Sequence, residues 1–367
     1  MKPWTRIEQF FKHEQLRALE GLLGLPEVSP RDVDWNRIKR ILVVRQHDQL
    51  GDFLLSTPVF EAIKKHAPTA EITLVARNYT ASLARHHRYI DDIMVVFEHG
   101  RYWTGANISR FTKQLGRGYD LAVVLNTVSH SLTSDLVARF SRARYILGSS
   151  NRLFSGTSRN FFYHLNAPFL GDRVRHQSER NLDIIRYLGI ECDSSREAIF
   201  LTGEEKQWAK NQLSGLGIDD KKKVVVVHPG AGKIGNRWPV DSFAEVARRL
   251  ADACGAQVIV TSGSNENELA SQFLQLMSSQ AFGWNSAHLR QVAAMISQAD
   301  LLLCNDTGIM HVCAAVGTPF IAVFGPTDPQ EWKPVGDEFI AIRGKDFTCL
   351  SVPENAVFEA AMSLLDK

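Results

Sequence analysis

Short apolar runs alternate with amphipathic stretches along most of the chain. Runs of this kind, bounded by polar residues, are typical of strands buried in a parallel sheet. They lie at 41–44, 72–76, 93–97, 121–125, 224–227, 258–260, 301–304 and 320–324. Helical patterns lie between them, at 58–66, 241–253, 266–277 and 289–298. The alternation predicts an α/β fold of parallel sheets with helices on both faces.

A polar stretch divides this pattern into two halves. Gly215 and Gly217 precede the charged run at 219–223, just before the apolar run at 224–227. A chain of 367 residues also suggests two domains, at ~150 residues each. We expect an N-terminal helical extension at 1–35, a first domain at 36–200, a second at 201–350 and a C-terminal helix at 351–367. Because doubly wound sheets bind ligands at the carboxyl ends of their strands, functional residues are expected in the loops that follow strands.

Charge balance, cysteine spacing and the length of apolar runs argue against several classes of protein. The 42 Lys and Arg nearly balance the 40 Asp and Glu, and no nucleic-acid-binding motif occurs, so a nucleic-acid partner is not expected. The five cysteines form no C-x-x-C pair, which argues against a zinc site and for a reducing compartment. No apolar run approaches the ~18 residues of a membrane span. We expect a soluble cytoplasmic protein. The apolar stripe within residues 1–35 allows peripheral membrane contact, although packing on the first domain is favoured.

Three loops carry candidate chemistry, and the first follows the run at 41–44. It places Asp52 shortly before Pro58, a residue at home in the first turn of a helix. A carboxylate at the carboxyl edge of a sheet can act as general base towards a hydroxyl group. On these residues alone, stabilisation of the helix terminus is the favoured role of Asp52.

The second loop, 228–239, is rich in glycine. It contains the spacing G-x-G-x-x-G at Gly230, Gly232 and Gly235. A dinucleotide site is therefore an alternative, but Pro239 delays the next helix, and no acidic residue follows the strand at 258–260. Lys233 and Arg237 remain as candidate contacts for a diphosphate. A solvent-exposed loop is an equal alternative.

The third loop, 305–311, follows a strand and opens a helix. Asp306 or Thr307 would cap that helix, and Gly308 would let a ligand approach its exposed N–H groups. The helix dipole favours an anion such as phosphate at this point. An ordinary capped helix is the alternative.

A local excess of arginine lies between residues 139 and 180, where eight arginines face two acids. Such a cluster can bind an acidic or phosphorylated partner through bidentate contacts. We expect Arg142, Arg144, Arg152 and Arg159 to bind an anionic acceptor. A solvated arginine-rich surface is the alternative.

Together these segments resemble glycosyltransferase family 9, the ADP-heptose:lipopolysaccharide heptosyltransferases. The resemblance rests on three motifs in order, Val44–Asp52 with Thr57-Pro58, His228-Pro229-Gly230 with Arg237-Trp238-Pro239, and Asn305–Gly308 with His311 and the segment 317–327. It extends from about residue 38 to the C-terminal helix near 353–365, and residues 1–35 are outside it.

The resemblance implies a GT-B fold, with two Rossmann-like doubly wound domains facing across a cleft. It implies inverting, metal-independent and cofactor-independent transfer of a heptose or related sugar from a nucleotide-sugar, such as ADP-heptose, to an anionic lipopolysaccharide core-type acceptor. Asp52 then matches the general base, reversing the preference stated above. The donor contacts implied or expected are Lys233, Asn236, Arg237, Glu266, Asp306, Thr307, Gly308 and His311, with Glu266 on the ribose.

The sequence departs from the family pattern at Asn236, where many members have a lysine, so that Lys233 or Arg237 is expected to stabilise the diphosphate. The cysteine-rich C-terminal stretch of some members is reduced to Cys349. Two alternatives remain open: an NAD(P)-dependent oxidoreductase using Gly230, Gly232 and Gly235, and a catalytically silent binding protein of the same fold.

Overall fold

The computed structural model describes residues 18, 20–22, 24–46, 49–127, 130–150, 159–170, 174–263 and 265–366. Most of the helix expected within 1–35 lies outside these residues. The contacts divide the chain into two compact units. The first contains Met1–Asp48, Pro58–Ala81 and His87–Ser194, and the second contains Gln49–Thr57, Ser82–His86 and Ser195–Lys367.

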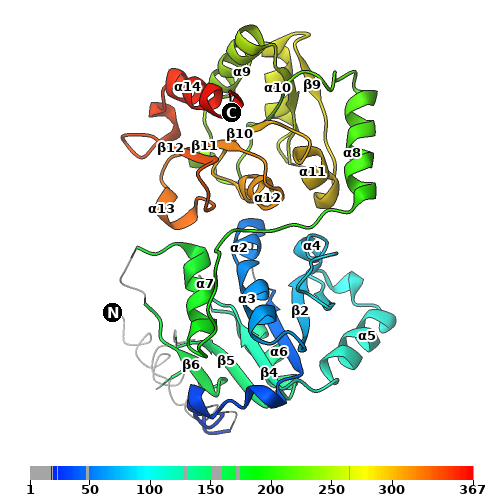
Figure 1. The fold of residues 1–367 in the computed structure, drawn as a ribbon, viewed down its shortest axis with the longest axis vertical. Coiled ribbons are helices and arrows are strands. Elements are labelled where there is room, and N and C mark those ends of the chain that lie inside the picture. The colour runs from blue at the N-terminus through cyan, green and yellow to red at the C-terminus, as the bar shows by residue number, and fades with distance from the viewer. Residues whose placement is uncertain are drawn as a thin grey trace, which may run out of the picture. The chain divides into compact units, whose positions relative to one another are not determined.

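The first unit is built on a six-stranded sheet in the order β3-β2-β1-β4-β5-β6, and every neighbouring pair is parallel. Its strands are β1 (Arg40–Arg45), β2 (Glu71–Arg77), β3 (Asp92–Val96), β4 (Leu121–Val124), β5 (Tyr145–Ser149) and β6 (Leu165–Ala167). Its helices are α3 (Pro58–His66), α4 (Asn78–Ala81), α5 (Gly105–Leu115), α6 (Leu132–Phe140) and α7 (Gln177–Arg186). Figure 1 traces this alternation from blue to green.

The second unit has a parallel six-stranded sheet in the order β12-β11-β10-β7-β8-β9. Its strands are β7 (Val224–His228), β8 (Gln257–Val260), β9 (Ala281–Gly283), β10 (Leu301–Asn305), β11 (Phe320–Phe324) and β12 (Phe339–Arg343). Its helices are α2 (Leu50–Leu54), α8 (Gly203–Gly215), α9 (Val240–Cys254), α10 (Asn267–Met277), α11 (Leu289–Ile296), α12 (Gly308–Val316), α13 (Pro329–Trp332) and α14 (Glu354–Leu365).

Numbered from its own first strand, each sheet has the order 3-2-1-4-5-6 of a doubly wound nucleotide-binding fold. The central strands β1, β4, β7 and β10 are almost entirely buried, as their continuous apolar runs predict. The expected α/β class is therefore confirmed. Within the described residues, none of the helices has both the length and the apolar character needed to cross a bilayer.

The structure corrects the expectation of an uninterrupted loop between the run at 41–44 and the helix that begins at Pro58, because α2 occupies Leu50–Leu54. By its contacts this helix belongs to the second unit, although it follows the first strand of the first. Strands β5, β6, β9 and β12 were not predicted either. β5 is largely buried but ends in Gly148 and Ser149, so its apolar run is short. β6 and β9 are only three residues long, and β12 is only partly buried.

Candidate active site

Helices α2 and α12 pack directly against each other, and a glycine on each helix makes the contact possible. A Cβ on Gly51 would lie 2.6 Å from Cδ2 of His311. A Cβ on Gly308 would lie 3.0 Å from both Cβ and Cδ2 of Leu50. The sequence indicated that Gly308 admits a ligand to the backbone, whereas the structure shows that its missing side chain also makes room for Leu50.

Asp52 occupies the first turn of α2 and is partly buried. Its Oδ2 accepts a hydrogen bond from the backbone N–H of Gln49 at 3.4 Å, which completes a capping box with the Gln49 side chain. The role favoured on the residues alone, stabilisation of a helix terminus, is thus present in the structure. The same carboxylate lies close enough to His311 to raise the pKa of that histidine.

His311 is buried in the first turns of α12 and pairs with the buried Glu197. Its Nδ1 lies 2.8 Å from Oε1 of Glu197. Burial alone would lower the pKa of His311, but the carboxylates of Glu197, Asp306 and Asp52 together raise it above its ordinary value. Sequence analysis missed Glu197, because it lies in an irregular segment before α8 and belongs to none of the three motifs.

Asp306 immediately follows β10 and is held by the glycine-rich loop. The amide Nδ2 of Asn236 donates to its Oδ2 at 2.9 Å and lies 3.4 Å from Oγ1 of Thr327. Burial raises the pKa of the Asp306 carboxyl, against the opposing influence of Thr327, His311 and Lys233. Asn236 is buried, so where many family members have a cation this chain has a neutral donor to Asp306.

Thr307 is the N-cap residue of the nine-residue helix α12, with an extended backbone. Within the described residues, its side chain makes no capping hydrogen bond. The first backbone N–H groups of a helix have no partner inside the helix, and the dipole is positive there. Thr307 and the start of α12 thus have the features expected of an anion-binding helix terminus, and this role stays a prediction.

Glu266 lies at the carboxyl ends of β7 and β8, immediately before α10. Its Oε2 lies 3.4 Å from Nε2 of His228 and 3.1 Å from the backbone N of Gly263. The hydrogen bond from His228 is the main cause that lowers the pKa of Glu266. A Cβ on Gly230 would collide with the Glu266 carboxylate, which explains this glycine by close approach of a side chain.

The glycines of the second loop do not open a helix. The loop contains a short 3₁₀ turn at Ile234–Asn236, and α9 begins only at Val240. The dinucleotide alternative therefore lacks the helix N-terminus that its fingerprint requires. Arg237 donates through Nε to the carbonyl of Ala231 at 2.8 Å, whereas Lys233 is exposed and acts electrostatically on Asp306.

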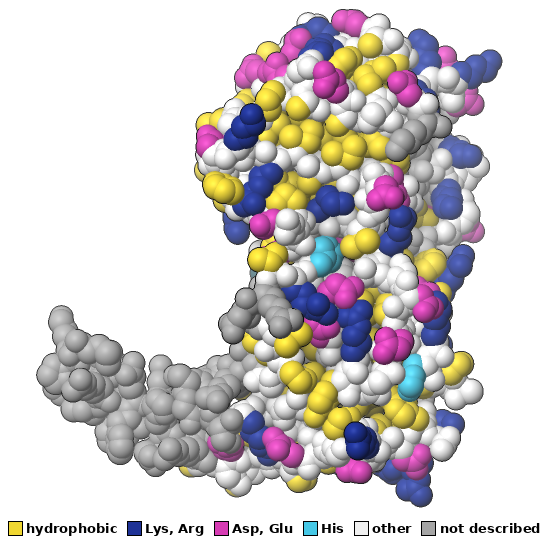
Figure 2. All heavy atoms as spheres, turned by 60° about the vertical axis from the view of Figure 1, so that its left-hand side comes forward, with side chains coloured by type: hydrophobic (Ala, Val, Ile, Leu, Met, Phe, Trp, Pro, Cys, Tyr) yellow, Lys and Arg dark blue, Asp and Glu magenta, His cyan; other side chains and the backbone are white. Residues whose placement is uncertain are grey.

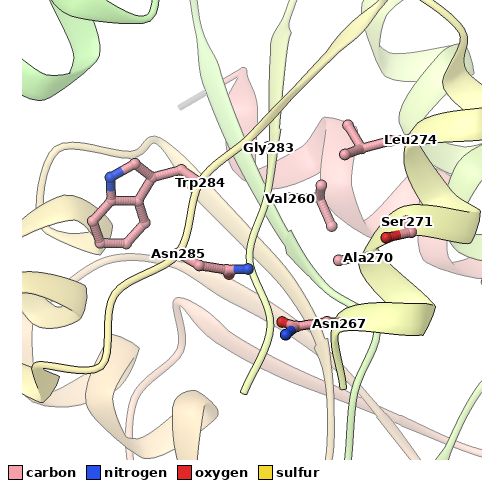
Figure 3. A pocket seen from close by; sticks show the side chains of 8 residues that line it. All are labelled: Val260, Asn267, Ala270, Ser271, Leu274, Gly283, Trp284 and Asn285. Atoms are coloured by element: carbon pink, nitrogen blue, oxygen red, sulfur yellow. The ribbon is translucent and has the colours of Figure 1, made fainter. Parts of the chain in front are cut away.

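A hollow of about 310 Å³ lies at the ends of β8 and β9 against α10. One of its lining residues, Asn267, directly follows Glu266 in the sequence. Figure 3 shows Asn267 and Ser271 on α10 facing it, with the Trp284 ring turned away from α10. Two hydrogen bonds hold the Asn285 side chain against Ser262. Its Oδ1 accepts from the backbone N of Ser262, and its Nδ2 donates to the Ser262 hydroxyl oxygen.

The structure describes three of the four arginines expected to bind an acceptor, Arg142, Arg144 and Arg159. Arg142 and Arg144 are exposed and lie between α6 and β5, at the amino end of β5, whereas doubly wound sheets bind ligands at the carboxyl ends. Arg159 donates to the carbonyls of Leu25 and Tyr163. Arg152 lies outside the described residues. Their acceptor role stays a prediction, and the placement of Arg142 and Arg144 gives it no support.

Two other arginines of this segment do lie at the carboxyl edge of the first sheet. Arg175 and Arg180 line a small hollow together with Thr127 and Ser149, which follow or end β4 and β5. Arg175 is paired with Asp183 through Nε and Nη2, at 2.5 Å each. On the face in Figure 2, basic and acidic side chains are interspersed.

Residues 108–355 match the family model of glycosyltransferase family 9 (heptosyltransferase). Lipopolysaccharide heptosyltransferase 3 of Escherichia coli is 28% identical over 299 residues, which cover 79% of this chain and 84% of the relative. Lipooligosaccharide heptosyltransferase 2 of Haemophilus influenzae is 27% identical over 317 residues, which cover 80% of this chain and 86% of the relative.

Solved structures show the same fold. The family 9 glycosyltransferase of Veillonella parvula superposes with a TM-score of 0.78 at 24% identity, covering 89% of this chain and 97% of that one. The E. coli heptosyltransferase WaaC, solved with ADP, superposes with a TM-score of 0.72 at 20% identity. The match covers 89% of this chain and 99% of that one. The fold is therefore the expected GT-B type, with two Rossmann-like units. The chain belongs to glycosyltransferase family 9, the heptosyltransferase family, and is a glycosyltransferase.

Proposed function

We propose that this enzyme transfers a heptose, or a related sugar, from ADP-heptose to a lipopolysaccharide core-type acceptor, with inversion and without a metal ion or other cofactor. The observation that carries the proposal is the grouping of Asp52, His311 and Asp306 where α2 meets the N-terminus of α12. The names of the relatives supply the sugar and the acceptor class. ADP in one solved relative supports the nucleotide.

In this scheme Asp52 removes the proton from the acceptor hydroxyl as its oxygen bonds to the anomeric carbon of the donor. The bond from that carbon to the diphosphate oxygen breaks on the opposite face, and its electron pair leaves with ADP. General-base assistance of this kind supplies ~10²–10⁴-fold in rate. Inversion follows because the incoming and departing oxygens lie on opposite faces.

The departing diphosphate gains negative charge, and the second unit offers groups that stabilise it. The N-terminal N–H groups of α12 and the Thr307 hydroxyl are fixed donors, and the exposed Lys233 is the flanking cation. Glu266 is proposed for the ribose, and Asp306 for the sugar. Asn236 contributes by holding Asp306, and Arg237 by bracing the loop at Ala231.

We place the anionic acceptor on the first unit. Arg142, Arg144, Arg152 and Arg159 remain candidates for its carboxylates and phosphates. Arg175 and Arg180 are added because they line a hollow at the carboxyl edge of that sheet. Work on the cytoplasmic face of the inner membrane, with peripheral contact to it, would bring the enzyme to a lipid-linked acceptor.

The test is a transfer assay with ADP-heptose, ADP-glucose and UDP-glucose as donors and truncated lipopolysaccharide cores as acceptors. We expect turnover with ADP-heptose and an inverted anomeric configuration in the product, measured by NMR. Retention of configuration would contradict the role of Asp52. Binding of each donor without any turnover would favour a silent binding protein, and stabilisation by NAD but not ADP would favour the oxidoreductase.

A further inference from the structure

We propose that Glu197 is a positioning residue for the transfer reaction, because it holds the His311 imidazole against the helix that carries Asp52. The inference deepens the proposed function and rests on it. His311 belongs to the third motif, but Glu197 belongs to none.

The segment around Glu197 is tied to both helices of the site. The backbone N of Ala198 donates to Oγ1 of Thr57, just after α2, at 3.0 Å. The backbone N of Ile199 donates to the carbonyl of Ala315 in α12 at 2.8 Å. Glu197 is therefore fixed by its neighbours beside the contact between α2 and α12.

The hydrogen bond of Glu197 determines which edge of the imidazole faces α2. Since Nδ1 faces the Glu197 carboxylate, Nε2 faces Gly51, where an added Cβ would lie 2.8 Å away. Gly51 immediately precedes Asp52. A carboxylate that accepts from one ring nitrogen fixes both the ring orientation and the place of its proton.

Stability alone does not account for this pair. Glu197 and His311 are both buried, and within the described residues Oε2 of Glu197 has no hydrogen-bond partner. A buried carboxylate with an unpaired oxygen lowers the free energy of unfolding. A buried ion pair seldom stabilises a protein more than well-packed apolar side chains in the same place would. A pair of this kind fits a site where the imidazole must keep a defined proton.

The charged groups around His311 favour its protonated form. Glu197 faces it from the segment before α8, Asp52 from α2 and Asp306 from the end of β10. The one charged residue of α11, Arg290, is instead paired with Glu205, and β11 carries no charged residue. These carboxylates raise the pKa of His311, so they favour the charged form of an imidazole that lies near both Asp52 and Asp306.

The experiment is a proton NMR titration of the histidines in the full-length enzyme, with the His311 signal assigned from its absence in His311→Gln. Glu197→Gln keeps the size and a hydrogen-bonding oxygen but removes the charge. We expect the pKa of His311 to fall by roughly one unit or more. Glu197→Asp keeps the charge at a shorter reach, and we expect a smaller fall. Glu204→Gln, an exposed change on α8, is the matched control and is expected to leave the titration unchanged.

Kinetics supply the second measurement. In Glu197→Gln we expect kcat to fall by ~10–100-fold, as for a displaced catalytic group, while the donor KM stays within about twofold. The alkaline limb of the pH profile is expected to move to lower pH, because His311 loses its proton earlier. A thermal unfolding curve checks that the variant folds.

The outcomes separate the two proposals. An unchanged His311 titration in folded Glu197→Gln overturns the positioning role, whatever sugar the enzyme transfers. A shifted titration with an unchanged kcat and pH profile overturns it as well, since the contact then serves the fold alone. If the wild-type enzyme transfers no sugar from ADP-heptose, the proposed function fails, and the titration still reports on the contact between Glu197 and His311.

Discussion

Asn236 donates from its buried amide to Oδ2 of Asp306, over 2.9 Å, and so joins the glycine-rich loop to the end of β10. The resemblance to family 9 implies a lysine at this position. A cation there would form an ion pair with Asp306, whereas the amide satisfies one carboxylate oxygen without adding charge. In the proposed function, the positive charge that faces the donor diphosphate is then supplied by other side chains.

Asn236→Ala is expected to raise the donor KM by about tenfold or more. It removes a hydrogen bond to a partly buried carboxylate, a contact of ~1.5–3 kcal/mol, and each 1.4 kcal/mol is a factor of ten. Steady-state kinetics with varied ADP-heptose would measure the effect. The exposed Asn211→Ala on α8 is the control, and an equal effect of both changes would show that the Asp306 contact is irrelevant to donor binding.

Asp52→Asn is expected to lower turnover by ~10²–10⁴-fold while donor binding and unfolding temperature stay nearly constant. The amide oxygen of asparagine can still accept from the backbone N of Gln49, so the helix cap survives. Single-turnover transfer and ADP titration would separate the two effects. Asp241→Asn, an exposed change in the first turn of α9, is the matched control. Retention of more than about a tenth of wild-type turnover would rule out Asp52 as the base.

The sequence predicted the two sheets because their central strands are continuous apolar runs. Such runs can be recognised as buried strands without knowledge of the strands that pair with them. It also singled out residues that follow β1, β7 and β10, because those segments carry recognisable motifs, and the roles assigned to these residues stay predictions. It did not predict α2, a five-residue helix whose stability comes from packing on α12. Nor did it predict Glu197, since the pairing with His311 joins residues 114 positions apart.

Lys233→Gln is expected to weaken ADP binding by about tenfold while adenosine binding is unchanged. Lys233 is exposed and its charge acts on the Asp306 region, so its partner is expected to be the diphosphate, which adenosine lacks. Because salt screens exposed ionic contacts, the difference in ADP affinity between the wild-type enzyme and Lys233→Gln should shrink as the salt concentration rises. Isothermal titration at two salt concentrations tests this, with Lys222→Gln as the exposed control. A loss of adenosine affinity equal to that of ADP would place the lysine elsewhere.

Thr307→Val is expected to weaken ADP binding more than adenosine binding, without a large change in stability. The hydroxyl makes no capping bond within the described residues, so its removal leaves α12 intact, and valine readily adopts the extended backbone. Thr202→Val is the contrasting control, because Oγ1 of Thr202 accepts from the backbone N of Glu205 in a capping box. That variant should lose ~0.5–2 kcal/mol of stability and keep its ADP affinity. The opposite pattern in chemical unfolding and titration would make Thr307 a structural cap.

Gly308→Ala is expected to destabilise the enzyme and lower its activity, and a second change should restore part of both. The new Cβ would lie 3.0 Å from Cβ and Cδ2 of Leu50, closer than side chains normally pack, so α2 must shift. Overpacking of this kind costs ~1–3 kcal/mol, and a shift of α2 also moves Asp52. Leu50→Ala removes Cγ and Cδ2, so two of the three close contacts disappear, and only the contact of the new methyl group with Cβ of residue 50 remains. In the Gly308→Ala/Leu50→Ala double variant, unfolding free energy and turnover should therefore exceed the values expected from adding the two single changes. Additive effects on both quantities would mean that Gly308 serves the ligand rather than the contact with α2.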